Sequence, residues 1–266
     1  MCRMLLFTGN NEPLFESLLK SLREVCSDDP LHELQHKPFL DHKDGWGYLD
    51  SGNRFLAFEK FLDPIFQSGK VNFNGDIRLI HARNATAGEP ITLTSTHPFH
   101  LPLEDHDLYL AHNGWIDKAK LSGKFSKNFM ETRSDSEVFL NVLGMFPGTP
   151  MEKFRSALEQ VYSTDSLRSG LNIFLFAVNR RTQDREMYIY SDARNFDLYH
   201  RLFLIRGENC SAVVSSSLLK AKEFPPKVEK VSLTPGTIYS MGITGCMAME
   251  EVTGCSTVES KETILL

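Results

Sequence analysis

The chain has 266 residues, of which 41% are hydrophobic and 24% charged, and its formal net charge is −5 at pH 7. This ordinary globular mixture can bury a core without disulfides or metals. The absence of any basic run argues against nucleic acid or an anionic membrane as a partner. No apolar stretch reaches the roughly 18 residues that span a bilayer, and the first residues do not resemble a signal peptide, so we expect a cytoplasmic protein.

The first half of the chain is predicted to combine one helix with several short strands. An apolar run at residues 2–7 predicts a strand at the very start. Residues 12–26 show helical spacing, with Asn11 as the N-cap and Pro13 in the first turn. Residues 28–43 are polar and irregular. Strand patterns follow at residues 47–50, 54–58, 76–81 and 107–111.

Two helices and a second group of strands are predicted after that. Residues 117–133 look loose, and helices are expected at 134–145 and about 150–162, the first opened by a capping box with Ser134 as N-cap and Glu137 three positions on. Strands are predicted at residues 171–178, 186–191, 202–206, 212–215, 228–231, 237–241 and 247–252. Because the strands form adjacent runs instead of alternating with helices, the pattern favours an α+β fold of antiparallel sheets with helices outside. We expect one domain over residues 1–266.

The cysteines and histidines do not predict a metal or a disulfide framework. The five cysteines are an odd number without a CxxC pair, which is typical of reduced thiols. The histidines at positions 81, 97, 100, 106 and 112 form no HExxH or HxH pattern. We therefore expect no metal site and no cofactor.

Cys2 is the cysteine whose position has chemical meaning. Removal of Met1 would leave a thiol and a free α-amino group on one residue. The amine has a pKa of about 7.7–8.0 and the thiol about 8.5, so near neutral pH the amine can accept the thiol proton. Cys2 would then supply both the nucleophile and the base. A cysteine at position 2, taken by itself, is more simply explained by chance.

Two further segments carry groups that suit the binding of a carboxylate and an oxyanion. Arg83 follows the predicted strand 76–81 and could present a planar fork to a carboxylate, although it could also be an ordinary surface arginine. Asn113-Gly114 follows the strand 107–111. This pair is often a hairpin turn, but its side-chain amide and backbone N–H could also stabilise an oxyanion.

Three other residues are weaker candidates. Asp135 lies in the first turn of a predicted helix, where it is held rigidly and could bind an ammonium group. Trp46, within Asp44-Gly45-Trp46-Gly47, could form an apolar wall of a pocket, or the segment could be a tight turn into a strand. His97 could line a site or be structural.

The order of these motifs is more informative than any one of them. A cysteine at position 2, then DGWG, HxRxxT at 81–86, HNG at 112–114 and SDSE at 134–137 together resemble the class II glutamine amidotransferases, which are N-terminal-nucleophile hydrolases. The resemblance implies a four-layer αββα sandwich of two antiparallel sheets. It covers about the first half of the chain. The DGWG and THPF segments look more similar to the stand-alone branch of the family than to its large synthases.

The resemblance also implies a role for each matching residue. Cys2 resembles the nucleophile, and Asn113 with Gly114 resembles the oxyanion hole. Arg83 resembles the residue that grips the α-carboxylate of a γ-glutamyl group, and Asp135 the partner of its α-ammonium group. Thr86 occupies the place of a helper residue in the same loop.

Three functions remain open at this point. The first is hydrolysis of a γ-glutamyl amide, either glutamine or a γ-glutamyl peptide or metabolite, through a thioester on Cys2. The second is a glutaminase subunit that passes ammonia to a separate synthase partner. The third is a non-catalytic binding protein of the same fold. In each case a small γ-glutamyl molecule is the expected ligand.

Overall fold

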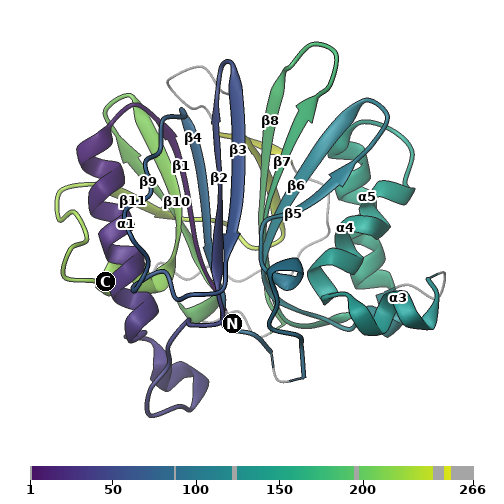
Figure 1. The fold of residues 1–266 in the computed structure, drawn as a ribbon, viewed down its shortest axis with the longest axis horizontal. Coiled ribbons are helices and arrows are strands. Elements are labelled where there is room, and N and C mark those ends of the chain that lie inside the picture. The colour runs from purple at the N-terminus through teal and green to yellow at the C-terminus, as the bar shows by residue number, and fades with distance from the viewer. Residues whose placement is uncertain (1, 87, 122–124, 195–197, 242–248, 253–266) are drawn as a thin grey trace.

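The computed structural model describes residues 2–86, 88–121, 125–194, 198–241 and 249–252. Two antiparallel sheets form its centre (Figure 1). The first sheet has the order β11-β9-β10-β1-β4-β2-β3, and the second has the order β13-β12-β8-β7-β6-β5. The prediction of antiparallel sheets in an α+β fold is thereby confirmed.

The strands of the first sheet come from both ends of the chain. They are β1 (Arg3–Gly9), β2 (Trp46–Gly52), β3 (Phe55–Phe61), β4 (Ile77–Ala82), β9 (Leu202–Gly207), β10 (Cys210–Ser215) and β11 (Glu229–Ser232). β1 lies between β10 and β4, so the start of the chain is inserted into the middle of the sheet.

The second sheet is built from the middle of the chain and from its last described strands. Its members are β5 (Phe99–Pro102), β6 (His106–Ile116), β7 (Leu167–Asn179), β8 (Arg185–Ser191), β12 (Thr237–Met241) and β13 (Met249–Val252). A strand was predicted at 247–252, and β13 spans Met249–Val252. Residues 247 and 248 lie outside the described residues.

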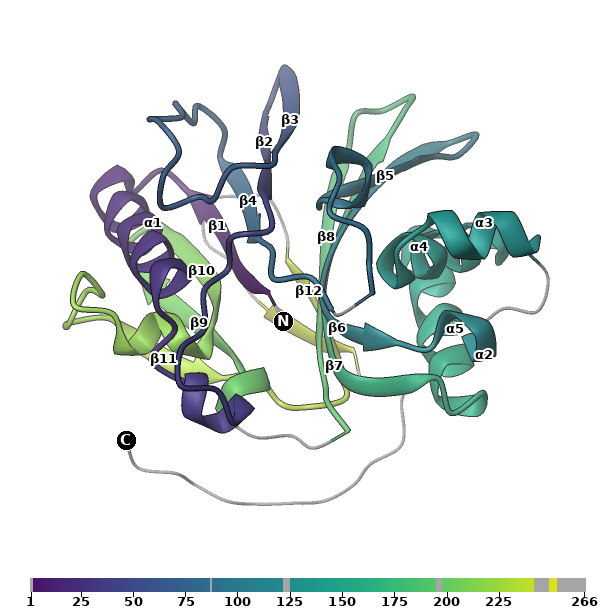
Figure 2. The ribbon, with the colours of Figure 1, turned by 60° about the horizontal axis from the view of Figure 1, so that its bottom comes forward.

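Helices cover the outer faces of both sheets. α1 (Glu12–Ser27) packs on the first sheet, while α4 (Asp135–Met145) and α5 (Pro150–Ser163) pack on the second, with the short α2 (Lys118–Leu121) and α3 (Lys127–Thr132) beside them (Figure 2). Short 3₁₀ turns lie at His32–Gln35, Leu93–Ser95, Leu198–His200 and Ser216–Lys220. The result is the layered αββα arrangement that the sequence predicts.

Three large apolar cores hold these layers together, and a small fourth cluster consists of Leu31, Leu40 and Tyr199. In β1, Leu5 and Phe7 face α1, whereas Met4 and Leu6 face the second sheet. This alternation is the two-residue period of a strand that is buried on both sides. The third core lies between the second sheet and α4 and α5. No helix in the described part of the chain has the length and apolar character needed to cross a membrane.

The structure differs from the predicted elements mainly around the site. β6 does not end at residue 111 but continues to Ile116, with Asn113 paired to Asn172 and Gly114 to Leu171 of β7. The hairpin interpretation of Asn113-Gly114 is therefore wrong. β5 was not predicted, and residues 117–133, expected to be loose, include α2 and α3.

The predicted helix starts are largely correct. The Asn11 side chain accepts the N–H of Leu14 at the start of α1. Ser134 caps α4 by accepting the N–H of Glu137 at 3.2 Å. The second half of the predicted capping box is absent, because the Glu137 carboxylate binds the Arg133 guanidinium at 2.7 Å instead.

Candidate functional site

Cys2 lies one residue before the first paired position of β1, on the face between the two sheets. The ladder with β4 begins at the pair Arg3 and Ala82. Since side chains alternate along a strand, Cys2 shares the inter-sheet face with Met4, while Arg3 points to the α1 side. The Cys2 thiol is buried, with Sγ 3.7 Å from the carbonyl oxygen of Asn84.

Asn113 binds the main chain of Cys2 directly. Its Oδ1 accepts the Cys2 backbone N–H at 2.8 Å, a contact that joins β6 of the second sheet to the start of β1. The side-chain Nδ2 of Asn113 is buried and has no hydrogen-bond partner among the described residues. The Asn113 side chain is thus fixed through Oδ1 while its NH₂ group is unpaired, and such a fixed donor is suited to bind an oxyanion.

A small cavity opens beside the thiol. Its volume is about 20 Å³, room for about one water molecule. It gathers side chains from the end of β4, the loop after it, β6 and the start of α4. The lining residues are Cys2, Arg83, Asn84, Ala85, Thr86, Glu89, Ser95, His97, His112, Gly114, Ser134, Asp135 and Ser136.

Arg83 is placed by the DGWG segment. The Arg83 N–H donates to the Gly45 carbonyl at 2.8 Å, and the Asp44 N–H donates to the Arg83 carbonyl at 3.0 Å. The Asp44 carboxylate also accepts the N–H of Ala85 at 2.8 Å. Gly45 has φ of +99°, a conformation that favours glycine. The Arg83 side chain is buried at the cavity wall, and its Nη1 donates to the Pro90 carbonyl at 2.9 Å.

Asp135 faces the same cavity from the first turn of α4. Its Oδ2 accepts the Ile116 N–H at 2.8 Å, and its Oδ1 accepts the Ser136 N–H at 2.8 Å. The helix N-terminus favours the negative charge. The carboxylate is thus fixed in place, and both of its oxygens already accept one backbone hydrogen bond.

Trp46 does not lie at the cavity. It is buried in the core between the first sheet and α1, stacked on Phe61 at 4.5 Å between ring centroids, and its indole N–H donates to the Ser68 hydroxyl at 2.7 Å. The alternation of β2 explains this position, because Trp46 shares the α1 face with Tyr48. The interpretation of Trp46 as a pocket wall has no support in this geometry.

His97 does line the cavity, within a group of three buried histidines. Its ring lies 3.9 Å from that of His81 between centroids, and neither of its ring nitrogens has a partner among the described residues. Burial lowers the pKa of His97 well below its usual value, and burial lowers the pKa of His81 to about 3. Burial also lowers the pKa of His112. All three imidazoles are therefore neutral near pH 7.

Glu89 is the charged cavity residue that no sequence motif indicated. Its Oε1 lies 3.2 Å from the ammonium group of Lys118, while Oε2 is buried without a partner among the described residues. The only signal in the sequence is its position six residues after Arg83, in the same loop. His112 and Ser136 also line the cavity, and a hydrogen bond of 2.9 Å joins His112 Nδ1 to the Ser136 hydroxyl. Both residues belong to motifs in which the sequence indicated only the neighbouring residues.

Gly114 is required where β6 passes β7. A Cβ atom built on Gly114 would lie 1.6 Å from the backbone oxygen of Gly170 and 2.7 Å from Nε2 of His112. The absence of a side chain at Gly114 therefore lets β6 and β7 approach closely beside the cavity. Among the described residues, no group of three or more His, Cys, Asp or Glu side chains has an arrangement that would hold a metal ion.

Comparison with known proteins agrees with this fold. The sequence model of the family "Glutamine amidotransferases class-II" matches residues 35–147. No curated protein matches the chain at a significant level.

Two solved structures share the architecture. One is described as the allosteric regulatory enzyme of purine biosynthesis, with 18% identity over 94% of this chain and a TM-score of 0.64. The other is glutamine phosphoribosylpyrophosphate amidotransferase from B. subtilis, with 17% identity over 94% of this chain and a TM-score of 0.59. This chain spans 49% of the length of each. The resemblance predicted from the motifs is confirmed for residues 35–147, which match the model of the class II glutamine amidotransferases, and the chain shares the fold of these two solved structures.

Proposed function

We propose that this protein hydrolyses a γ-glutamyl amide through a thioester on Cys2, after removal of Met1. The observation that carries the proposal is the contact of the Cys2 nitrogen with Asn113 Oδ1 at 2.8 Å, which leaves the Asn113 NH₂ group unpaired. In the processed chain that nitrogen is the α-amino group. One residue would then orient the base while offering a donor for the oxyanion.

The proposed substrate head group is an amino acid held by charge at both ends. Arg83 binds the α-carboxylate with its guanidinium fork, and Asp135 binds the α-ammonium group. Glu89 supports the same cation through its unpaired Oε2. Thr86 and His97, which line the cavity, contact the substrate between these ends.

The reaction would run in two halves. The Cys2 thiol transfers its proton to the α-amino group, and Sγ attacks the γ-carbonyl carbon. The resulting oxyanion accepts hydrogen bonds from Asn113 Nδ2 and the Gly114 N–H. Collapse of this intermediate breaks the C–N bond, and the α-ammonium group protonates the leaving nitrogen. Water then attacks the thioester, which releases glutamate and restores the thiol.

A glutamine-like affinity label tests the nucleophile. We expect intact mass to show loss of Met1 and one adduct, mapped by peptide analysis to Cys2. Cys2→Ala should abolish both the adduct and the hydrolysis. Cys210→Ala is the matched control, because that thiol is equally buried but lies outside the cavity lining. An active Cys2→Ala protein would refute the mechanism, and a chain that keeps Met1 would do the same.

The likeness to a phosphoribosylpyrophosphate amidotransferase favours a second candidate, a glutaminase that passes ammonia to a synthase partner. The two candidates are separated by the turnover of glutamine and of γ-glutamyl peptides by the purified chain. Turnover without any added protein supports the stand-alone hydrolase. Activity that appears only with a partner supports the ammonia-supplying subunit.

A further inference from the structure

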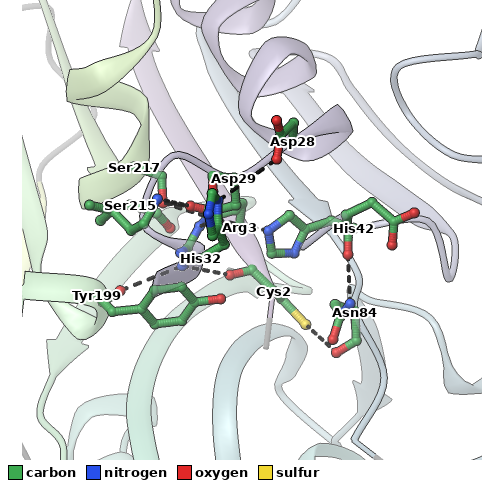
Figure 3. Close-up of polar contacts among 12 residues, drawn as sticks. Cys2, Arg3, Asp28, Asp29, His32, His42, Asn84, Tyr199, Ser215 and Ser217 are labelled. Carbon is green, nitrogen blue, oxygen red and sulfur yellow. Dashed lines mark hydrogen bonds and ion pairs between the residues drawn. The ribbon is translucent and has the colours of Figure 1, made fainter. Parts of the chain in front are cut away.

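A buried ion pair lies next to Cys2 (Figure 3), and neither of its residues lines the cavity. Arg3 Nε donates to Asp29 Oδ2 at 2.6 Å, and both side chains are 0% exposed. The same carboxylate accepts the Ser217 hydroxyl at 2.9 Å, the Leu31 N–H at 2.9 Å and His42 Nε2 at 2.9 Å. None of these residues lines the cavity.

The pair is charged at neutral pH. Burial opposes the charge of Asp29, but attraction from Arg3 and the hydrogen bond from His42 more than offset it and hold the pKa of the carboxyl well below its usual range. Burial lowers the pKa of His42 to about 4, so this imidazole is neutral and donates its Nε2 hydrogen to Asp29. Asp29 therefore receives donors from several sides and fixes the direction of the Arg3 side chain.

Stability alone does not account for such a pair. Desolvation of two charges costs several kcal/mol per ion, and an apolar pair of similar volume is often as stable or more stable. A buried pair can instead serve to fix a geometry. The nearest group whose geometry matters is the residue before Arg3.

The main chain of Cys2 is held by side chains, because strand pairing begins only at Arg3. Its nitrogen is held by Asn113. Its carbonyl oxygen accepts a hydrogen bond from Arg3 Nη1 at 3.2 Å. The Arg3 guanidinium also lies over the Tyr199 ring, 3.8 Å from its centroid, which restrains the plane of the fork.

We propose that Arg3, oriented by Asp29, is a positioning residue for the nucleophile. Because Arg3 fixes the carbonyl group of Cys2, it also fixes the direction in which the Cys2 side chain projects from the strand. This inference rests on the proposed function. Because Arg3 points to the α1 side and does not reach the cavity, its loss should lower kcat and leave KM nearly unchanged. A displacement of about 1 Å in a reacting group can cost about 10²-fold in rate.

The test is a double variant that removes both charges, Arg3→Met with Asp29→Leu. We expect removal of Met1, confirmed by intact mass, and a folded protein with a lower melting temperature, because the donors of Ser217, Leu31 and His42 lose their acceptor. We also expect kcat to fall about a hundredfold with KM within twofold, and alkylation of Cys2 by iodoacetamide to slow. The control is Arg78→Met with Glu12→Gln, which removes an ion pair of 2.7 Å between β4 of the same sheet and α1, where Arg78 also covers an aromatic ring.

A folded and processed double variant with wild-type kcat and alkylation rate would overturn the proposal, and so would a rise in KM alone. If the double variant does not fold, Arg3→Lys decides. Lysine can pair with Asp29 but lacks the fork that also reaches the Cys2 carbonyl, so unchanged kcat in folded Arg3→Lys overturns the role. Failure of the proposed function would be seen in a different experiment, because the Cys2→Ala protein would then still hydrolyse the substrate.

Discussion

Arg83 combines a fixed backbone with a side chain at the cavity wall. Arg83→Lys keeps the charge but loses the planar fork that binds a carboxylate through two parallel hydrogen bonds. We expect KM to rise about tenfold to a hundredfold with little change in kcat, because a charged hydrogen bond contributes about 1.5–3 kcal/mol. Steady-state kinetics on a γ-glutamyl substrate measures this. The exposed Arg206→Lys serves as control, and equal KM values would remove Arg83 from the substrate site.

Glu89 gives a second prediction at this scale. Glu89→Gln keeps the shape of the side chain but removes the charge proposed to support the α-ammonium group. We expect KM to rise about tenfold for substrates with a free α-amino group. A substrate analogue without that group should be hydrolysed equally by both proteins. If the variant loses activity equally on both substrates, Glu89 has no contact with the ammonium group.

Most of the residues proposed from the sequence lie at the cavity, and Trp46 does not. Cys2, Arg83, Thr86, His97, Gly114 and Asp135 all line it, and Asn113 binds the nitrogen of Cys2. Cys2, Arg83 and Asp135 lie at strand ends and at a helix start, where the side-chain direction follows from local structure, whereas Asn113 and Gly114 lie inside β6. Trp46 was misjudged because the face of β2 on which it lies depends on packing. Glu89 was missed because a carboxylate in an irregular loop has no local pattern that gives its direction.

β6 and β7 approach each other most closely beside the nucleophile. Gly114→Ala would place Cβ 1.6 Å from the Gly170 oxygen, so the two strands must separate there. We expect a loss of at least about 1–3 kcal/mol in the free energy of unfolding, measured in urea, together with a large loss of activity. Gly69→Ala is the control, since a Cβ there meets no atom within 4 Å. A stable, active Gly114→Ala protein would show that the approach is not needed.

Elements with strong periodicity were predictable, and those fixed by pairing were less so. α1 follows from apolar spacing and from the N-cap at Asn11. α5, expected at about 150–162, spans Pro150–Ser163. The true length of β6 could not be predicted in this way. Asn113-Gly114 is locally a turn signal, and these two residues adopt strand conformation only because they pair with β7. β5 has only four residues, one of them Pro102. A strand this short shows no clear alternation of apolar and polar side chains.

At the scale of the whole molecule, several neutral histidines are buried in the layers. Burial lowers the pKa of His42 to about 4 and that of His81 to about 3, whereas an unfolded chain binds these protons near pH 6.5. The stability that they contribute is complete above about pH 6.5 and is lost as the pH falls toward 4. Each such histidine lowers the free energy of unfolding by up to about 1.4 kcal/mol per pH unit in that range.

Urea unfolding at pH 7, 6 and 5 checks this dependence. We expect His42→Gln to make the pH profile shallower, and the exposed His36→Asn to leave it unchanged. Asp29, whose pKa lies well below its usual range, adds a further loss only below about pH 4. A flat profile between pH 7 and 5 in the wild type would mean that the buried histidines do not titrate as described.

The central position of β1 has a consequence for the order of events during synthesis. β1 is completed by β4 at residues 77–82 and by β10 at residues 210–215. A ribosome has therefore made most of the chain before the second neighbour of β1 exists, and pairings so distant in sequence form late. Until then the first residues are accessible to a methionine aminopeptidase. Under the proposed function, removal of Met1 therefore precedes the burial of Cys2, and β10 completes the sheet around β1 afterwards.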